Sequence, residues 1–184
     1  GVGRRSWTAG GRLLPRARRS RQAGELPPWE RPVTRWLSAL CWLLTAASGA
    51  VIVTDPAASP AETLAARELH RYLWLRTGVL VPLATALPAR GEAFVVARGD
   101  RAGLPPGLAA GDLGPQQWLL RRVAGPAGQR LYLLGGDEAG VLYATYRFAE
   151  RLGVRFYLHG DVVPDGLLPL AIPPLNERGR PLFA

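Results

Sequence analysis

The spacing of apolar residues changes along the chain, and one stretch has the period of a helix. Between residues 60 and 77 apolar residues recur every three or four positions, which predicts a helix with one apolar face. Ser59 and Glu62 have the types and spacing of a capping box at its start, and Gly78 supplies a stop at its end. The expected apolar face consists of Ala61, Leu64, Ala65, Leu69, Tyr72 and Leu73.

The rest of the pattern predicts short strands and a second helix. Runs of apolar and β-branched residues indicate strands at about 51–53, 79–83, 93–97, 117–123, 129–134 and 154–158. Gly125–Gly128 is a turn-forming stretch, so the strands on either side of it are expected to form an antiparallel hairpin. The second helix is predicted from Asp137 to Leu152, with Gly153 as its stop. The Gly- and Pro-rich stretch 99–114 is expected to loop out.

These elements predict an α/β (α+β) fold with the order β-α-β-β-β-β-α-β. Because each helix has a single apolar stripe to bury, both are expected to pack on one face of a mixed sheet. After residue 158 the chain is interrupted by Pro164, Pro169, Pro173 and Pro174, and no closing element is expected before Ala184. The length of 184 residues suits one domain with an appendage, whereas a carbohydrate-cleaving barrel typically needs about 250 residues.

The formal net charge of +9 is concentrated at the start of the chain. Residues 1–35 hold nine of the 23 Arg and only two acids, whereas residues 36–184 hold 14 Arg and 12 acids. The Arg-rich segment 1–35 has no apolar periodicity and is expected to be disordered. The folded part is close to neutral, so its composition does not favour nucleic acid as a partner. RNA binding through the basic segment stays a third, weaker alternative.

Residues 36–50 have the pattern of a secretory signal. A positive flank at Arg35 precedes an uncharged apolar run, and small residues stand three and one positions before a cut after Ala50. We therefore expect an exported protein that is secreted or associated with the cell envelope. The run is shorter than the roughly 20 residues of a membrane-spanning helix, so a membrane is a partner only through this segment. A buried N-terminal helix is the alternative interpretation.

The turn Gly135–Gly140 lies between a predicted strand and a predicted helix, where phosphate-binding loops occur. Its sequence GGDEAG fits neither the dinucleotide-binding nor the P-loop spacing and has no lysine. It also holds two adjacent acids, Asp137 and Glu138, whereas a glycosidase needs two carboxylates roughly 5–10 Å apart across a sugar pocket. Neighbours at a helix start usually diverge, so we expect both acids to cap the helix.

The other polar residues do not suggest a catalytic or metal site. His70 and His159 have no nucleophile near them in sequence, and Ser59, the only serine after residue 50, is assigned to the helix cap. A single cysteine, Cys41, and two histidines supply neither a disulfide nor a zinc cluster. No catalytic residue, cofactor-binding residue or metal ligand is therefore predicted, and no cofactor.

Aromatic side chains are the remaining candidates for contact with a glycan. Trp74 is expected off the apolar face of the first helix. The full set is Trp74, Trp118, Tyr132, Tyr143, Tyr146 and Tyr157. At helix and strand spacing such residues more often form a core or an inter-domain contact, and we prefer that interpretation to stacking on sugars.

Two segments together resemble a known family. The first comprises Ser59, Pro60, Ala61, Glu62, Ala65, Ala66, Glu68, Leu69, Tyr72, Leu73, Thr77, Gly78 and Pro82. The second is residues 133–164, with the sequence LLGGDEAGVLYATYRFAERLGVRFYLHGDVVP. They are similar to the N-terminal, non-catalytic domain of α-glucuronidase-like glycoside hydrolases and to the second domain of bacterial β-hexosaminidases. The resemblance covers residues 51–175, and residues 176–184 resemble the linker that enters the catalytic barrel.

The resemblance implies an accessory domain of an exported glycoside hydrolase that acts in carbohydrate breakdown. In such enzymes the catalytic carboxylates lie in the barrel that follows, so none is carried onto this sequence, and this chain alone is expected to be inactive. The implied partner is the catalytic barrel of the same full-length chain. The alternative is a stand-alone carbohydrate-binding or interaction module, for which a glycan is the partner.

Overall fold

The computed structural model describes residues 49–108 and 110–181. The predictions for residues 1–35 and for residues 36–48 lie outside this part of the chain. The described residues belong to one compact unit. None of the helices within these residues is long and apolar enough to cross a membrane.

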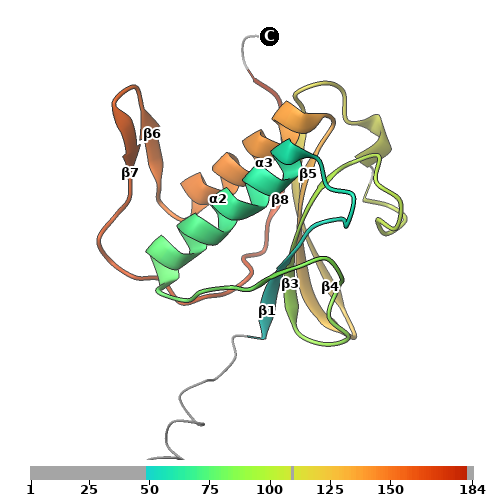
Figure 1. Cartoon of the computed structure of the whole chain (residues 1–184), viewed down its shortest axis with the longest axis horizontal. Coiled ribbons are helices and arrows are strands. Elements are labelled where there is room, and N and C mark those ends of the chain that lie inside the picture. The colour runs from blue at the N-terminus through green and yellow to red at the C-terminus, as the bar shows by residue number, and fades with distance from the viewer. Residues whose placement is uncertain (1–48, 109, 182–184) are drawn as a thin grey trace, which may run out of the picture. The chain divides into compact units, whose positions relative to one another are not determined.

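A six-stranded mixed sheet forms the centre of the fold (Figure 1). Its strand order is β2-β1-β3-β5-β4-β8. The bounds are β1 Ala50–Val53, β2 Leu83–Ala84, β3 Glu92–Arg98, β4 Trp118–Gly125, β5 Gly128–Gly135 and β8 Asn176–Gly179. The pairs β1–β2, β1–β3 and β3–β5 are parallel, and β4 runs antiparallel to both β5 and β8. The mixed sheet expected from the sequence is therefore confirmed, and Gly125–Gly128 closes the predicted β4–β5 hairpin.

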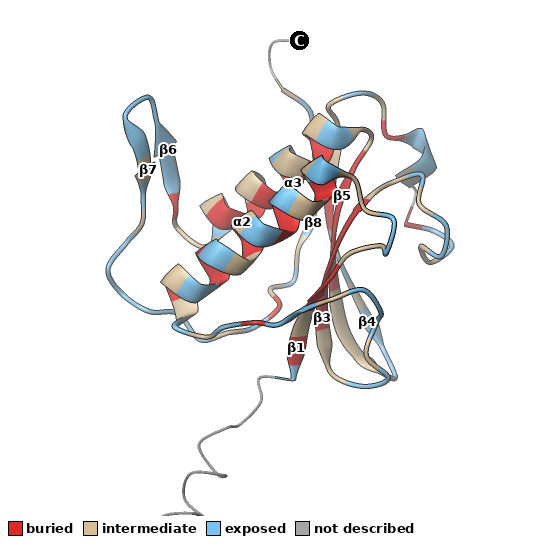
Figure 2. Cartoon of the chain, viewed as in Figure 1, coloured by how far each residue is buried: buried red, intermediate tan, exposed pale blue. Residues whose placement is uncertain are grey.

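Both helices lie on one face of the sheet, as predicted (Figure 1). They are α2 Pro60–Thr77 and α3 Glu138–Arg151. Their buried sides face the strands (Figure 2) and enclose the main core. Its largest fully buried side chains include Phe94, Phe148, Ile52, Leu69, Leu73, Leu131 and Leu133. Two expected core positions differ, because Leu64 is 47% exposed and Ala61 is only half-buried, whereas Ala66 is buried.

The second face of the sheet is covered by the segment that was expected to loop out. Residues 99–108 and 110–117, with the short 3-10 helix η1 Ala110–Asp112, fold back over the strands. Leu108 and Leu113 are buried there against Tyr132 and Leu134 of β5. The expectation of an outward loop was wrong because these leucines have apolar sheet surface to bury.

Three strands differ from the sequence-based prediction. The expected strand 79–83 is replaced by the two-residue β2, and Val81 is fully buried outside any strand. The expected strand 154–158 is β6 Arg155–Tyr157, which pairs with β7 Gly160–Val162 in a separate hairpin and not with the main sheet. Strand β8 was not predicted, and it places residues 176–179 of the expected linker at the sheet edge beside β4.

Candidate functional site

The Gly135–Gly140 turn has a packing role in this structure. The Asp137 side chain accepts a hydrogen bond from the Gly140 backbone N–H at 2.7 Å, so it caps α3 as expected. Gly135 has no room for a side chain, because a Cβ there would lie 2.0 Å from the Val141 nitrogen. Glu138 is exposed in the first turn of the helix. The turn therefore caps the N-terminus of α3.

Ser59 takes part in the predicted capping box, and the structure extends that box into a buried polar cluster. The Ser59 hydroxyl accepts from the Glu62 N–H at 3.3 Å, and Glu62 accepts from the Ser59 N–H at 2.8 Å. Glu62 is 0% exposed and also accepts hydrogen bonds from the Arg98 N–H and the Arg101 guanidinium. This cluster ties α2 to the end of β3 and to the loop that follows.

The two histidines lie on different elements. His70 is half-buried on α2, and His159 is exposed in the β6–β7 turn, where its ring stacks on Tyr157 at 5.4 Å. In the described part of the chain, no three His, Cys, Asp or Glu side chains are grouped so that they could hold a metal ion.

The aromatic candidates do not form one surface. Trp74, Tyr143 and Tyr157 are exposed, as expected for Trp74. Trp118 is half-buried, and its ring meets Gly179 and the Arg147 guanidinium. Tyr146 packs edge-on against Phe156, and Tyr132 is buried on the opposite face of the sheet. Some of the six aromatic side chains therefore pack in the interior, and others are exposed on the surface.

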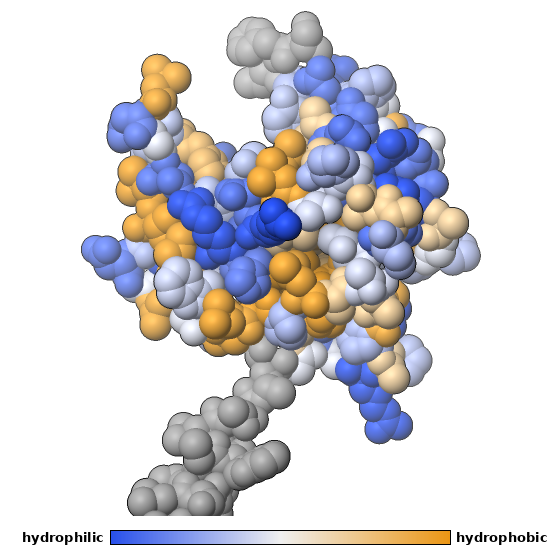
Figure 3. Space-filling model, viewed as in Figure 1, coloured by the Kyte–Doolittle hydropathy of each residue, from blue (hydrophilic) through white to orange (hydrophobic). Residues whose placement is uncertain are grey.

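The β6–β7 hairpin and the segment that follows it carry several exposed apolar side chains, and Figure 3 shows orange surface on the side of the molecule where this hairpin lies. We define the hairpin patch as Phe156, Tyr157, Leu158 and Val162 of this hairpin together with Leu167 and Leu168, which follow it in the chain and lie beside the end of α2. The hairpin is fixed at its base, because the Phe156 ring packs against Tyr72 and Tyr146 at 5.8 and 5.2 Å. The Asp161 carboxylate also accepts hydrogen bonds from the Arg71 guanidinium at 2.9 Å and the Tyr72 hydroxyl at 3.0 Å. These contacts anchor the hairpin to both helices and hold its exposed side chains in a defined position.

The Asp161 cluster perturbs the ionisation of its members. Burial, followed by the hydrogen bond to Asp161, raises the pKa of Tyr72 to about 12. Hydrogen bonds from Tyr72 and Arg71 lower the pKa of Asp161 although partial burial opposes them. Because Tyr72 stays protonated at neutral pH, its hydroxyl is a permanent donor to the carboxylate. The cluster therefore acts as an anchor for the hairpin.

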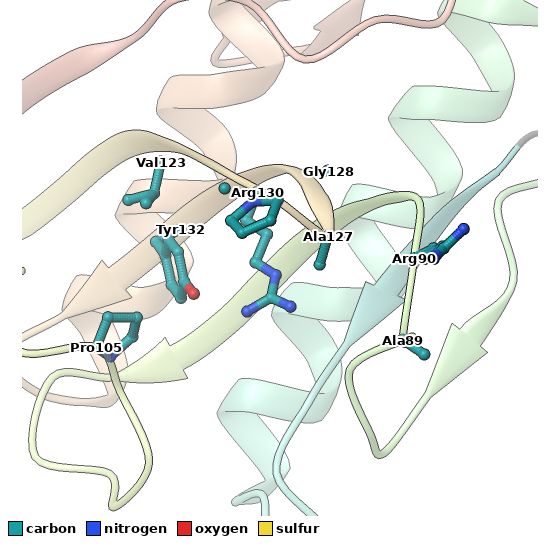
Figure 4. Close-up of a pocket in the computed structure, with 10 residues that line it drawn as sticks. Ala89, Arg90, Pro105, Val123, Ala127, Gly128, Arg130 and Tyr132 are labelled. Carbon is teal, nitrogen blue, oxygen red and sulfur yellow. The ribbon is translucent and has the colours of Figure 1, made fainter.

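Two hollows lie on the second face of the sheet, at the borders of the covering segment. The larger, of about 420 Å³, is next to the β4–β5 turn and is lined by Arg130, Tyr132, Val123 and Pro105 (Figure 4). The smaller, of about 200 Å³, lies beside Asp55, Arg101 and Leu104. Tyr132 lines both.

The side chains of this face are set by the register of the strands. Arg130, Tyr132 and Leu134 alternate with the core residues of β5 and point away from the helices. Tyr132 lies between Val95 of β3 and Arg121 of β4. The sequence pattern indicates Tyr132 only as one of the aromatic candidates and predicts no role for Arg130.

Comparisons with known proteins show a likeness among solved structures only. No protein-family model and no curated protein sequence matches the chain. Among solved structures the chain is similar to a family GH115 4-O-methyl-alpha-glucuronidase with specificity for decorated arabinogalactans. The TM-score is 0.44 at 19% identity, over 59% of this chain and 14% of that one. A score of this size does not establish a common fold, so the proposals below rest on the residues themselves.

Proposed function

We propose that residues 51–175 are the non-catalytic accessory domain of an exported, α-glucuronidase-like glycoside hydrolase. In this proposal the domain packs against the catalytic barrel of the same full-length chain and supplies no catalytic group. Two observations support it. The segments 59–82 and 133–164 resemble that family; the first supplies α2, and the second supplies α3 and the β6–β7 hairpin. The second observation is the exposed hairpin patch, which supports the proposed packing against the barrel.

An exposed apolar cluster of this kind favours a macromolecular contact. Leu158 at the hairpin tip is fully exposed, and Tyr157 and Leu167 are 56% and 67% exposed. Large apolar side chains exposed on one part of a surface commonly mark a docking site, because burying them in a contact is favourable. The anchor through Asp161 and Phe156 orders the patch beforehand, which lowers the entropy cost of docking.

The test uses the gene from which this sequence derives. We expect the reading frame to continue past Ala184 into a barrel, and the longer chain to unfold in one cooperative transition. Leu158→Asp should split that transition into two, because a charge at the contact uncouples the two domains. The control is Leu80→Asp, an exposed leucine outside the hairpin patch, which should leave the single transition intact.

Two results contradict the proposal. The first is a stop codon directly after Ala184 in the gene. The second is hydrolysis of aryl glycosides by the purified 184-residue chain itself, since the proposal assigns the catalytic carboxylates to the barrel.

A stand-alone carbohydrate-binding module is the second candidate function. It is favoured by the exposure of Trp74, which is 48% exposed on α2, because a flat aromatic ring can stack on a sugar. This candidate predicts retardation of the chain in gels that contain a soluble polysaccharide, and loss of retardation in Trp74→Ala. The accessory-domain proposal predicts equal mobility with and without polysaccharide.

The export part of the proposal can be made more specific from strand β1. A signal cut after Ala50 would remove a residue that is 3% exposed and pairs with Glu92. It would also remove the Gly49 carbonyl, which accepts a hydrogen bond from the Glu92 N–H at 2.8 Å. We therefore propose that processing occurs before Gly49. Intact-mass measurement of the secreted protein tests this, and a mature N-terminus at Val51 would contradict it.

A further inference from the structure

The Tyr132 hydroxyl is a buried polar group without a partner. The residue is 1% exposed, and its hydroxyl oxygen makes no hydrogen bond within the described part of the chain. Leaving such a group unsatisfied is costly, and native proteins rarely do so. The hydroxyl lies at the wall of the hollow beside the β4–β5 turn (Figure 4). A polar atom of a molecule in that hollow would satisfy it.

Arg130 adds an uncompensated positive charge to the same hollow. Its guanidinium forms no ion pair with any acid among residues 49–108 and 110–181. No acidic residue lines the hollow, whereas Arg90 lies at its rim and extends away from Tyr132 in Figure 4. Arg130 and Tyr132 stand two residues apart on β5, so their side chains lie on the same face of the sheet, as Figure 4 shows. The local field therefore favours an anion.

The wall of the hollow is rigid because two backbone segments approach each other closely there. The Gly91 N–H donates to the Ala127 carbonyl at 2.8 Å and joins the loop before β3 to the β4–β5 turn. Gly128 has a φ of 130°, and a Cβ there would lie 2.1 Å from the Gly91 carbonyl oxygen. Only glycine fits this approach, so the turn that borders the hollow is fixed before any ligand arrives.

We propose that this hollow binds the oxyanion of a small organic ligand, a carboxylate or a phosphate ester. The planar Arg130 fork suits two oxygens of such a group, and the Tyr132 hydroxyl donates to one of them. Val123 and Pro105 contact the less polar body of the ligand. The volume of about 420 Å³ lies within the range of small-molecule sites and suits a ligand of one or two rings. This proposal does not depend on the accessory-domain proposal.

The experiment is a binding titration of the 184-residue chain by isothermal calorimetry and by amide chemical shifts. The probes are inorganic phosphate and D-glucuronate, with D-glucose as the uncharged match for glucuronate. We expect saturable binding of at least one anion, shifts at residues 125–132, and no binding of glucose. Preference for phosphate or for glucuronate distinguishes the two sources of the oxyanion.

Two substitutions assign the binding to the proposed groups. Arg130→Gln should weaken anion binding by about tenfold or more, because it removes charge-assisted hydrogen bonds. Arg122→Gln is the matched control, since Arg122 is exposed on the neighbouring strand with its side chain on the opposite face. Tyr132→Phe should weaken anion binding while leaving the melting temperature of the free chain unchanged or raised, because the lost hydroxyl has no partner to leave behind.

Three outcomes overturn the proposal. Neither anion binds saturably, or Arg130→Gln binds as tightly as the unchanged chain, or glucose binds as tightly as glucuronate. A lowered melting temperature in ligand-free Tyr132→Phe also counts against it, because the hydroxyl would then already have a partner. Each readout uses the chain without a barrel, so failure here leaves the accessory-domain proposal standing.

Discussion

Replacing Glu62 by Gln should destabilise the domain more at neutral pH than in acid. All the neighbours of this carboxylate are donors. Oε1 accepts from the Arg98 N–H at 2.9 Å and the Arg101 Nε at 3.1 Å, and Oε2 accepts from the Ser59 N–H at 2.8 Å and a second Arg101 nitrogen. A Gln side chain presents an NH₂ group in place of one oxygen, so one pair of donors faces another donor in either orientation.

The size of the effect follows from the ionisation of the carboxyl group. Burial alone would raise the pKa of Glu62, but hydrogen bonds from Arg101, Ser59 and Arg98 outweigh burial and lower it from 4.5 to about 2. Because the pKa is lower in the folded state, this stabilisation is present above pH 4.5 and is lost as the pH falls through about 2. The shift corresponds to about 3 kcal/mol, of which about 2 kcal/mol is already lost at pH 3.

Urea unfolding of the full chain, followed by far-UV circular dichroism at pH 7 and pH 3, measures this directly. We expect Glu62→Gln to lower the free energy of unfolding by about 3 kcal/mol at pH 7 and by about 1 kcal/mol at pH 3. Glu138→Gln is the matched control, since Glu138 stands exposed in the first turn of α3, and it should change stability by less than about 1 kcal/mol. An equal gap between wild type and Glu62→Gln at both pH values would refute the reasoning.

Three other substitutions test separate parts of the fold. Arg76→Leu should cost about 3 kcal/mol in urea unfolding, because this buried residue, 5% exposed, donates through its guanidinium to three backbone carbonyls that would lose their partner. Gly135→Ala should cost about 2–3 kcal/mol in the same assay, since its Cβ would meet the Val141 nitrogen, and a cost near zero would contradict the close packing. Asp161→Asn should lower the pKa of Tyr72 from about 12 towards its ordinary value without reaching it, because burial remains. Carbon-13 NMR of labelled tyrosine measures that pKa, and an unchanged value would contradict the anchor.

The helices could be predicted because their signals are local. Ser59 and Glu62 form the capping box within one turn, and Asp137 caps α3 through Gly140 three residues away. Neither interaction depends on the rest of the fold. The buried ion pair of Glu62 could not be predicted in the same way, because its partner Arg101 is 39 residues further along the chain.

The errors concern segments whose structure depends on distant partners. Strand β8 has the sequence NERG, which has no strand signal of its own, and it forms because β4 offers an open edge. The strand predicted at residues 154–158 is expected to join the mixed sheet, yet β6 pairs only with β7 and all three of its residues are exposed. The apolar composition of a segment indicates that its surface favours burial, but it does not identify the partner that buries it. The partner can be the main sheet or another part of a larger assembly.

The composition of β5 indicates that the second face of the sheet is also covered, which the alternation of apolar and polar residues along the chain does not indicate. Residues 131–134 are apolar without interruption and all buried, which is typical of a strand covered on both sides. Such a strand requires a second covering layer, and residues 99–108 and 110–117 supply one over Tyr132 and Leu134. That layer ends before Arg130, which shares the parity of Tyr132 and therefore its face. In β5, the charged Arg130 therefore stands where the covering layer ends and the hollow begins. The Arg130 guanidinium and the unpartnered Tyr132 hydroxyl belong to this border.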